Sequence, residues 1–205
     1  MMAKFMAPRQ RPRTPGFVVH TREHSKKELY FTPDECDWVI NYGQKEYPEF
    51  ASVGENGGEV RRETRDVYVR NIFMNEQTNG LFEKMMFIAD VTNQNHFDFE
   101  IAGIMHGLQL LEYTSHETKQ HYDWHIDVGG GSSYGRKISM VVQLSDPNDY
   151  EGGDLQVDEG QPVSMPKERG AVVLFPSYMR HRVMPVTKGT RWSLVIWVQG
   201  YTHFR

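Results

Sequence analysis

The second half of the chain is a series of short strand-like runs separated by turn signals, and this pattern restricts the fold more than any other feature. The runs are rich in β-branched and aromatic residues: Leu108–Tyr113, His121–Val128, Arg136–Leu144, Asp154–Val157, Ala171–Phe175, His181–Val186 and Arg191–Gln199. Turn-forming sequences such as Gly129-Gly130-Gly131 and Asp146-Pro147-Asn148 lie between them. Many short strands at this spacing predict a β-sandwich or a β-barrel.

The first half of the chain predicts helices instead. Thr32 and Glu35 have the spacing of a capping box, and Pro33 occupies the first position of the helix that follows. We expect this helix to end at Gly43, and the apolar spacing within residues 75–91 predicts a second helix. The expected fold class is therefore mostly β with flanking helices (α+β).

The two halves are not separated by a long linker, and 205 residues fit one domain. We expect a single domain over residues 17–205, with a helical buttress at about 30–95 and a β core at about 107–200. Residues 1–16 carry four basic side chains among three prolines, which predicts a flexible basic tail. A basic arm that contacts an acidic partner is the alternative interpretation.

Composition narrows the classes of partner. The formal net charge of -4 gives no overall support for nucleic-acid binding. Cys36 is the single cysteine, so no intrachain disulfide can form, and a reducing compartment is expected. No apolar run approaches the length of a membrane span, and the N-terminus lacks the apolar stretch of a signal peptide. We therefore expect a cytoplasmic protein with neither nucleic acid nor membrane as a partner; the oligomeric state stays open.

A candidate metal site begins in the run at residues 121–127. Residues two apart in a strand face the same side, so His125 and Asp127 would present an imidazole and a carboxylate together. His181 is the best candidate for a third ligand, because it begins a later strand after the turn-like Pro176-Ser177-Tyr178. Two histidines and one carboxylate on one face of a metal form the facial triad of non-haem Fe(II) oxygenases.

An H-x-D pair alone is weak evidence, since a surface histidine beside a solvated aspartate is more common. Arg191 strengthens the interpretation: beyond a predicted turn at Lys188-Gly189, it is expected on the strand next to that of His181, pointing into the same cavity. A guanidinium matches a carboxylate with two parallel hydrogen bonds, and Ser193 would share its face. The alternative is that Arg191 pairs with a surface acid.

Several segments together resemble the PKHD-type hydroxylases, in the prolyl 4-hydroxylase-like branch of the Fe(II)/2-oxoglutarate-dependent dioxygenases. The most specific pieces are Tyr122-Asp-Trp-His125-Ile-Asp127, the stretch at residues 144–155 and the stretch at residues 181–191. From residue 32 to 109 the resemblance is looser. It implies a double-stranded β-helix, or jelly roll, with helices against one face and the metal at its mouth.

The resemblance also assigns roles by position. The residues that match the family's iron ligands are His125, Asp127 and His181. Arg191 matches the anchor of 2-oxoglutarate, Tyr113 stands where relatives place a tyrosine that bonds it, and Ser193 is added as a possible donor. Gln143 departs from relatives that carry a second tyrosine. Trp197 stands near the expected substrate entrance, although a core position would suit it equally.

The implied activity is an Fe(II)-, 2-oxoglutarate- and O2-dependent hydroxylation of an unactivated C–H bond, with succinate and CO2 as co-products and ascorbate as an optional reductant. The branch favours a prolyl residue of a peptide or protein; a free amino acid or small metabolite is the alternative. Rival classes are a non-enzymatic jelly-roll metal-binding module and a zinc hydrolase. The intact triad with Arg191 disfavours the first, and the lack of an H-E-x-x-H motif disfavours the second.

The segments around the expected site stay ambiguous. Residues 52–66 and 129–135 could wall a substrate groove, and the glycines at 129–131 suit either a mobile lid or a slack loop. Tyr122 and Trp124 are expected to serve in packing. Four arginines near the groove could steer an acidic substrate or form a solvated face: Arg61, Arg62, Arg65 and Arg70.

Overall fold

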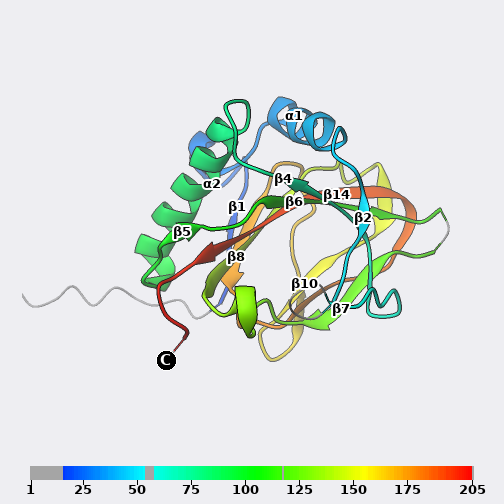
Figure 1. Cartoon of the computed structure of the whole chain (residues 1–205). Helices are drawn as coiled ribbons and strands as arrows, with labels where there is room; N and C mark the ends of the chain where they lie inside the picture. The colour runs from blue at the N-terminus through cyan, green and yellow to red at the C-terminus, as the bar shows by residue number, and fades with distance from the viewer. Residues whose placement is uncertain (1–15, 54–57, 117, 205) are drawn as a thin grey trace, which may run out of the picture.

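The computed structural model describes residues 16–53, 58–116 and 118–204. Its architecture is two antiparallel β-sheets stacked face to face, with helices against the outer face of the larger sheet (Figure 1). The predicted fold class, mostly β with flanking helices, is confirmed. The predicted tail at residues 1–16 lies outside the described residues except for Gly16, and the division of the chain into tail and domain stays a prediction.

The larger sheet has nine strands, and its main path runs in the order β1-β12-β8-β14-β6-β4-β2. In that order the strands are β1 (Val18–His20), β12 (Val172–Pro176), β8 (Arg136–Gln143), β14 (Val186–Gln199), β6 (Leu108–Thr114), β4 (Tyr68–Ile72) and β2 (Glu49–Phe50). Two further strands pair with β14: β5 (Gly103–Ile104) and β9 (Tyr150–Gly152). The long strand β14 is thus the centre of the sheet.

The smaller sheet has five strands in the order β11-β10-β13-β7-β3. They are β11 (Pro162–Ser164), β10 (Leu155–Asp158), β13 (His181–Val183), β7 (His121–His125) and β3 (Arg65–Asp66). Neighbouring strands come from distant parts of the sequence, since β13 pairs with both β10 and β7. This arrangement brings the predicted metal-binding segments onto adjacent strands.

Two α-helices cover the larger sheet: α1 (Pro33–Gly43) and α2 (Asn79–Thr92). The capping box of α1 is confirmed, because Thr32 Oγ1 accepts from the Glu35 N–H and Glu35 Oε2 accepts from the Thr32 N–H. The second helix begins at Asn79 rather than 75. The side chain of Asn75 accepts hydrogen bonds from two following backbone N–H groups, which holds this segment in a turn. The chain also forms three short helical turns: η1 (Lys27–Leu29), η2 (Asn93–Phe97) and η3 (Gly131–Ser133).

The predicted strand ends were wrong in two places. Strand β7 stops at His125 rather than 128, because the N–H groups of Asp127 and Val128 donate to the Ser177 carbonyl instead of a neighbouring strand. The turn predicted at Lys188-Gly189 is instead an irregularity within the continuous strand β14. Gly189 has a φ of +71°, and an added Cβ would lie 2.1 Å from the Asp149 carbonyl oxygen.

The two faces of the larger sheet bury different side chains. Its outer face and the helices form one apolar core, which includes Cys36, Met85 and Ile88 and, from β14, Leu194 and Ile196. The inner face meets the smaller sheet in a second core. Alternation along β14 sends Arg191, Ser193, Val195 and Trp197 to this inner side, where they line a cavity. Among the described residues, no helix is long and apolar enough to cross a membrane.

Candidate active site

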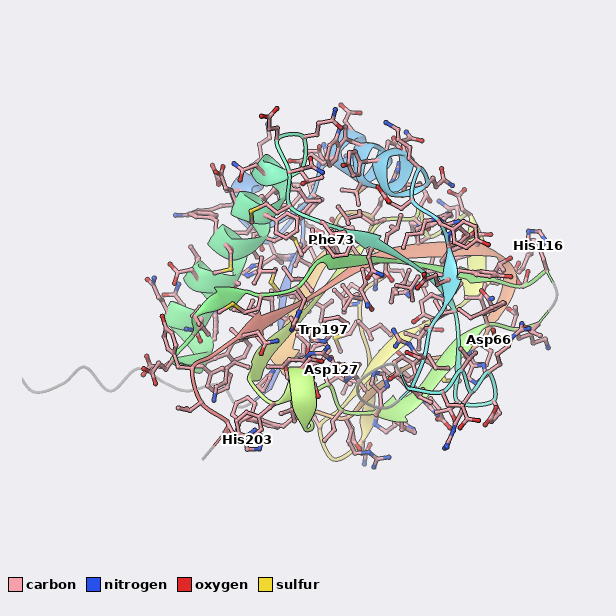
Figure 2. All side chains as sticks on the ribbon, in the orientation of Figure 1. Asp66, Phe73, His116, Asp127, Trp197 and His203 are labelled. Carbon is pink, nitrogen blue, oxygen red and sulfur yellow. The ribbon has the colours of Figure 1, made fainter. Side chains whose placement is uncertain are left out.

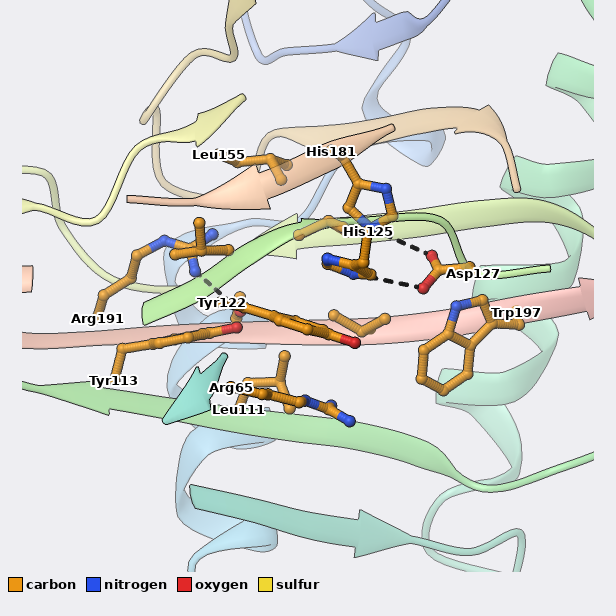
Figure 3. Close-up of a pocket in the computed structure, with 14 residues that line it drawn as sticks. Arg65, Leu111, Tyr113, Tyr122, His125, Asp127, Leu155, His181, Arg191 and Trp197 are labelled. Atoms are coloured by element: carbon orange, nitrogen blue, oxygen red, sulfur yellow. Dashed lines mark hydrogen bonds and ion pairs between the residues drawn. The ribbon is translucent and has the colours of Figure 1, made fainter. Parts of the chain in front are cut away.

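The three predicted metal ligands meet at one end of the space between the sheets (Figure 3). His125 ends β7 and is directly paired with His181, the first residue of β13. Asp127 follows two residues after His125. Nε2 of His125 lies 3.7 Å from Asp127 Oδ1, and Nε2 of His181 lies 3.3 Å from Asp127 Oδ2. One ligand atom from each residue lies within 4.8 Å of the others, so this group could hold a metal ion.

Hydrogen bonds fix the orientation of both imidazole rings. Nδ1 of His125 lies 2.7 Å from the Asp123 carbonyl oxygen, and Nδ1 of His181 lies 3.0 Å from the Met179 carbonyl oxygen. A carbonyl oxygen can only accept, so each Nδ1 carries a proton and each Nε2 is the atom that faces Asp127, as in a metal-binding histidine. Both histidines are therefore presented to the same point in space.

Two buried serines orient the carboxylate of Asp127, one directly and one through the other. Ser139 Oγ donates to Asp127 Oδ2 at 2.6 Å, and Ser177 Oγ lies 3.0 Å from Ser139 Oγ. Ser139 comes from the centre of β8 in the larger sheet, and all three residues are buried. Asp127 is thus oriented from the sheet opposite to the histidines, which restricts its carboxylate to the position where it meets them.

The local electrostatics favour metal binding at neutral pH. Burial, followed by the proximity of His181, lowers the pKa of His125 to about 3, so its ring is neutral near pH 7. Burial alone would raise the pKa of Asp127, but the two histidines and the Ser139 hydrogen bond outweigh it and lower that pKa to about 2. A neutral imidazole and an ionised carboxylate are the forms that bind metal.

Tyr122 belongs to this site, which corrects its expected packing role. Strand β7 contains a bulge opposite β13: His125 pairs with His181, but the next pair joins Tyr122 to Val183. The extra residue reverses the side-chain alternation, so Tyr122 faces the cavity with His125. Their ring centroids lie 3.4 Å apart and the rings are nearly parallel. The strict alternation assumed from the sequence did not include this bulge.

The other residues of this segment face away from the site. Trp124 lies beneath the guanidinium groups of Arg180 and Arg182, at 5.4 and 4.5 Å from their carbons, consistent with the packing role expected for it. Asp123 is exposed, and its Oδ1 accepts from the Trp124 N–H within the bulge. The second H-x-D pair, His121 and Asp123, therefore takes no part in the metal-ligand group.

Arg191 lies at the opposite end of the same cavity (Figure 3). It belongs to the sheet opposite to His181 rather than to the neighbouring strand, which corrects the sequence-based placement. Only 1% of Arg191 is exposed. Its guanidinium donates to Gln143 Oε1 at 2.8 Å and to Ser193 Oγ at 3.3 Å, and its Nε has no hydrogen-bond partner.

A buried guanidinium with neutral partners is costly unless an anion joins it. Among the described residues, no carboxylate forms an ion pair with Arg191, so a surface acid does not explain it. Tyr113 lies below it, with its ring centroid 5.5 Å from the guanidinium carbon, and is 1% exposed. Gln143, at the position where the sequence departs from some relatives, uses its carbonyl to orient the guanidinium.

The cavity between Arg191 and the three ligands is narrow, with a volume of about 30 Å³. This is room for roughly one water molecule. The ring of Tyr122 lies between the two ends, beside Tyr113 (Figure 3). An anion larger than water therefore requires a lining side chain to move, and Tyr122 is the side chain in the direct path.

Trp197 lines the cavity beside Asp127 (Figure 2). Its indole N–H is buried and has no hydrogen-bond acceptor with good geometry. It points toward Asp127, and its proximity is one of the weaker causes that lower the pKa of that carboxyl. Trp197 is therefore at the site rather than in the remote core. The two-residue repeat of a strand, counted from Arg191, predicts that Trp197 lies on the inner face. This is the signal that the sequence offered.

Ser139 was not identified from the sequence, although a signal existed. It is a polar residue at the centre of an apolar run, and it shares its parity with Gln143 in the predicted strand 136–144. Arg136 was also missed, because the sequence shows a basic residue at the start of a strand but not the ring of Trp197 on which its guanidinium stacks. The glycines at 129–131, for which the sequence suits either a mobile lid or a slack loop, lead into the helical turn η3, and both interpretations stay predictions.

Residues 108–199 match the family model described as the 2OG-Fe(II) oxygenase superfamily. The chain belongs to this superfamily. Among curated proteins, it is 31% identical over 150 residues to a PKHD-type hydroxylase of Synechococcus elongatus, covering 68% of this chain and 66% of that protein. It is 34% identical over 111 residues to a PKHD-type hydroxylase of Crocosphaera subtropica, covering 52% of this chain and 50% of that protein. The chain thus spans about half to two thirds of these relatives' length.

Solved structures share the fold. A prolyl-4-hydroxylase of Pseudomonas putida matches with a TM-score of 0.68 at 19% identity, covering 91% of this chain and 94% of that one. A prolyl hydroxylase of Trichoplax adhaerens, in complex with a peptide fragment of hypoxia inducible factor, matches with a TM-score of 0.69 at 20% identity, covering 91% and 84%. The expected double-stranded β-helix is confirmed by these matches.

Proposed function

We propose that the protein is an Fe(II)- and 2-oxoglutarate-dependent dioxygenase that hydroxylates a prolyl residue of a peptide or protein. One observation carries this proposal: a group of two histidines and one carboxylate shares a cavity with a buried guanidinium that lacks an acidic partner. The superfamily name states the two requirements, a 2-oxo acid and Fe(II). Each end of the cavity has the chemistry suited to one of them.

The donor set fits Fe(II). His125, Asp127 and His181 would supply two imidazole nitrogens and one carboxylate oxygen, a donor set that leaves room at Fe(II) for a 2-oxo acid and O2. When bound, Fe(II) with O2 and 2-oxoglutarate would supply the oxidising power, with succinate and CO2 as co-products and ascorbate as an optional reductant. The protein would contribute the position and charge of its own side chains.

The remaining residues divide into anchoring and orienting groups. Arg191 would bind the far carboxylate of 2-oxoglutarate through its guanidinium, with Ser193 as a second donor and Tyr113 as a phenol donor beside it. Gln143 holds the guanidinium in place, since its Oε1 accepts from Arg191. Ser139 keeps Asp127 in the position where it meets both histidines.

The prolyl substrate is inferred from the relatives. Curated relatives are named PKHD-type hydroxylases, and the structure from Trichoplax adhaerens is a prolyl hydroxylase in complex with a peptide. An open pocket next to the metal-ligand group is bordered by Ser52, Val53, Gly129, Ser132 and Ser133, as a groove for a chain would require. A free amino acid or small metabolite stays the alternative substrate.

Anaerobic visible spectroscopy tests the site before any substrate is known. Fe(II) plus 2-oxoglutarate should give a weak charge-transfer band that neither produces alone. The band should disappear in His181→Ala, and Arg191→Ala should require a much higher concentration of 2-oxoglutarate. If the folded, Fe(II)-loaded protein gives no band, the proposed function is wrong. Succinate release with prolyl peptides and with free amino acids then separates the two substrate classes.

A further inference from the structure

A second pocket opens beside the metal-ligand group and shares Arg65, Tyr122, Asp127 and Trp197 with the inner cavity. Its volume is about 360 Å³, enough for an amino-acid side chain or a small acid. We propose that this outer pocket binds a carboxylate of the substrate between Arg65 and Arg136. The proposal rests on the proposed function and deepens it, because it names a chemical class of substrate.

The structure separates Arg65 from the other arginines near the predicted groove. Three of the four form ion pairs: Arg61 with Glu59 at 3.0 Å, Arg62 with Asp66 at 2.9 Å, and Arg70 with Glu112 at 2.7 Å. Arg65 lines the outer pocket and has no acidic partner among the described residues. One of the four therefore keeps its charge directed at the site.

Arg65 is held by neutral groups. Its Nη1 donates to the Ser52 carbonyl at 3.0 Å, and its Nη2 approaches Gln109 Oε1 at 3.4 Å. Its guanidinium carbon lies 4.7 Å from the ring centroid of Tyr122, and its Nε is buried without a hydrogen-bond partner. The aromatic ring and the carbonyl fix the orientation of the guanidinium but leave its charge uncompensated.

Arg136 also lines the pocket and repeats this arrangement. Its guanidinium carbon lies 3.8 Å from the ring centroid of Trp197, and its Nη1 donates to the Asp127 backbone carbonyl at 3.2 Å. Its Nε is also buried without a partner. The carboxylate of Asp127 points elsewhere, to Ser139 and the histidines. Neither Arg65 nor Arg136 forms a salt bridge with any described residue.

Two partly buried guanidinium groups that line one pocket disfavour each other. Both side chains are partly buried, and each has a buried Nε without a hydrogen-bond partner, so both have lost part of their hydration. An anion bound between them would relieve both the repulsion and the loss of solvation, and a carboxylate can accept two hydrogen bonds from each fork. The pocket is therefore built for a negative group.

The anion in question is distinct from 2-oxoglutarate. The anchor Arg191 lies at the far end of the inner cavity, whereas Arg65 and Arg136 stack on Tyr122 and Trp197 next to the metal ligands. A carboxylate held here would lie close to the metal and thus close to the carbon that reacts. An acidic residue beside a peptidyl proline and the carboxylate of a free amino acid both offer this chemistry.

The test compares matched probes that differ only in charge. The protein is loaded with Zn(II), which has no redox chemistry, and with 2-oxoglutarate, and binding is measured by calorimetry. One arm compares the acetylated, amidated dipeptides Pro-Glu and Pro-Gln; the other compares L-proline with L-prolinamide. In at least one arm the carboxylate probe should bind about 10- to 100-fold more tightly, the size of one charge-assisted hydrogen bond. The arm that shows the preference identifies the source of the carboxylate.

Variants test whether the two arginines cause the preference for the carboxylate probe over the neutral probe. Arg136→Gln and Arg65→Gln should each reduce it to below about threefold, and Arg136→Lys should restore part of it, because a lysine keeps the charge but not the fork. Arg70→Gln is the matched control: its guanidinium also stacks on a tryptophan, Trp192, but it pairs with Glu112 outside the pocket. This control should keep the full preference.

Equal binding of charged and neutral probes in both arms, or no binding of either carboxylate probe, overturns the carboxylate proposal. So does a preference that survives in both glutamine variants. The charge-transfer band of the Fe(II) and 2-oxoglutarate complex reports the proposed function separately. If the band forms while the carboxylate preference is absent, only the outer-pocket proposal is wrong; if the band is absent, the proposed function itself is wrong.

Discussion

The two faces of the larger sheet differ in the polar groups that they bury. The outer face packs Leu194 and Ile196 of β14 against the helices in an apolar core. The inner face, supplied by the same strand, buries Arg191 and Ser193 and places Trp197 beside Asp127. The outer face stabilises the fold by removing apolar surface from water. The inner face contributes to a second apolar core and also buries polar groups, which we propose bind a ligand.

Loss of a metal ligand on the smaller sheet, which packs against the inner face, should have the largest effect. His181→Ala removes one of three donors, and we expect Fe(II) affinity to fall more than about 100-fold, beyond the effect of losing an orienting partner. The fold should persist, because the outer core is untouched. Metal content after dialysis and the circular dichroism spectrum check both statements. Retention of stoichiometric Fe(II) would exclude His181 as a ligand.

Arg191→Met should separate function from stability. We expect 2-oxoglutarate affinity to fall about 100-fold, since a bidentate charge-assisted contact is lost. We also expect the free energy of unfolding to stay equal or to rise, because an apolar side chain of similar length replaces a buried guanidinium without an acidic partner. Calorimetric binding and urea denaturation measure the two effects. A large loss of stability would show that Arg191 belongs to the structural core.

Met85→Ala is the counterpart on the outer face. Met85 is fully buried between α2 and the sheet, so the truncation should lower the free energy of unfolding by about 2–5 kcal/mol. At a temperature where the variant is folded, its affinity for Fe(II) should equal that of the parent protein. Denaturation curves and metal titration provide the comparison. A change in metal affinity would mean that the two faces are coupled.

Ser139→Ala should give a smaller, local effect. Removing its hydroxyl leaves Asp127 Oδ2 without the 2.6 Å hydrogen bond that orients it. We expect Fe(II) affinity to fall about tenfold, the lower end of the range for partners that orient metal ligands. Ser177→Ala, which acts on Asp127 only through Ser139, should have a weaker effect. The reverse order in a metal titration would contradict this chain of hydrogen bonds.

The smallest effect is expected at Cys36 in the outer core. The side chain is fully buried, and burial raises the pKa of its thiol to about 12. Since the thiolate is the reactive form, iodoacetamide at pH 8 should not modify the folded protein and should modify it after denaturation. Mass spectrometry distinguishes the two. Rapid modification of the folded protein would show that the helical layer opens readily.

Local patterns in the sequence determined much of this molecule. The capping box at Thr32 and Glu35 specifies a helix start through contacts three residues apart. The alternation along β14 separates Arg191 and Ser193 from the apolar residues between them, because side chains in a strand repeat with a period of two. The resemblance of residues 121–127 and 181–191 predicted which side chains form the metal-ligand group.

Tertiary structure decided what depends on partners distant in the sequence. The bulge that brings Tyr122 to His125 exists only because β7 pairs with β13, and no local period predicts it. The distinction between Arg65 and its neighbours depended on which acids lie within reach after folding. Arg136, at the start of β8, joined the site because its guanidinium stacks on Trp197 of the neighbouring strand β14. Periodicity is a property of one segment, whereas charge compensation and strand register are properties of pairs of segments, so only the folded chain could decide them.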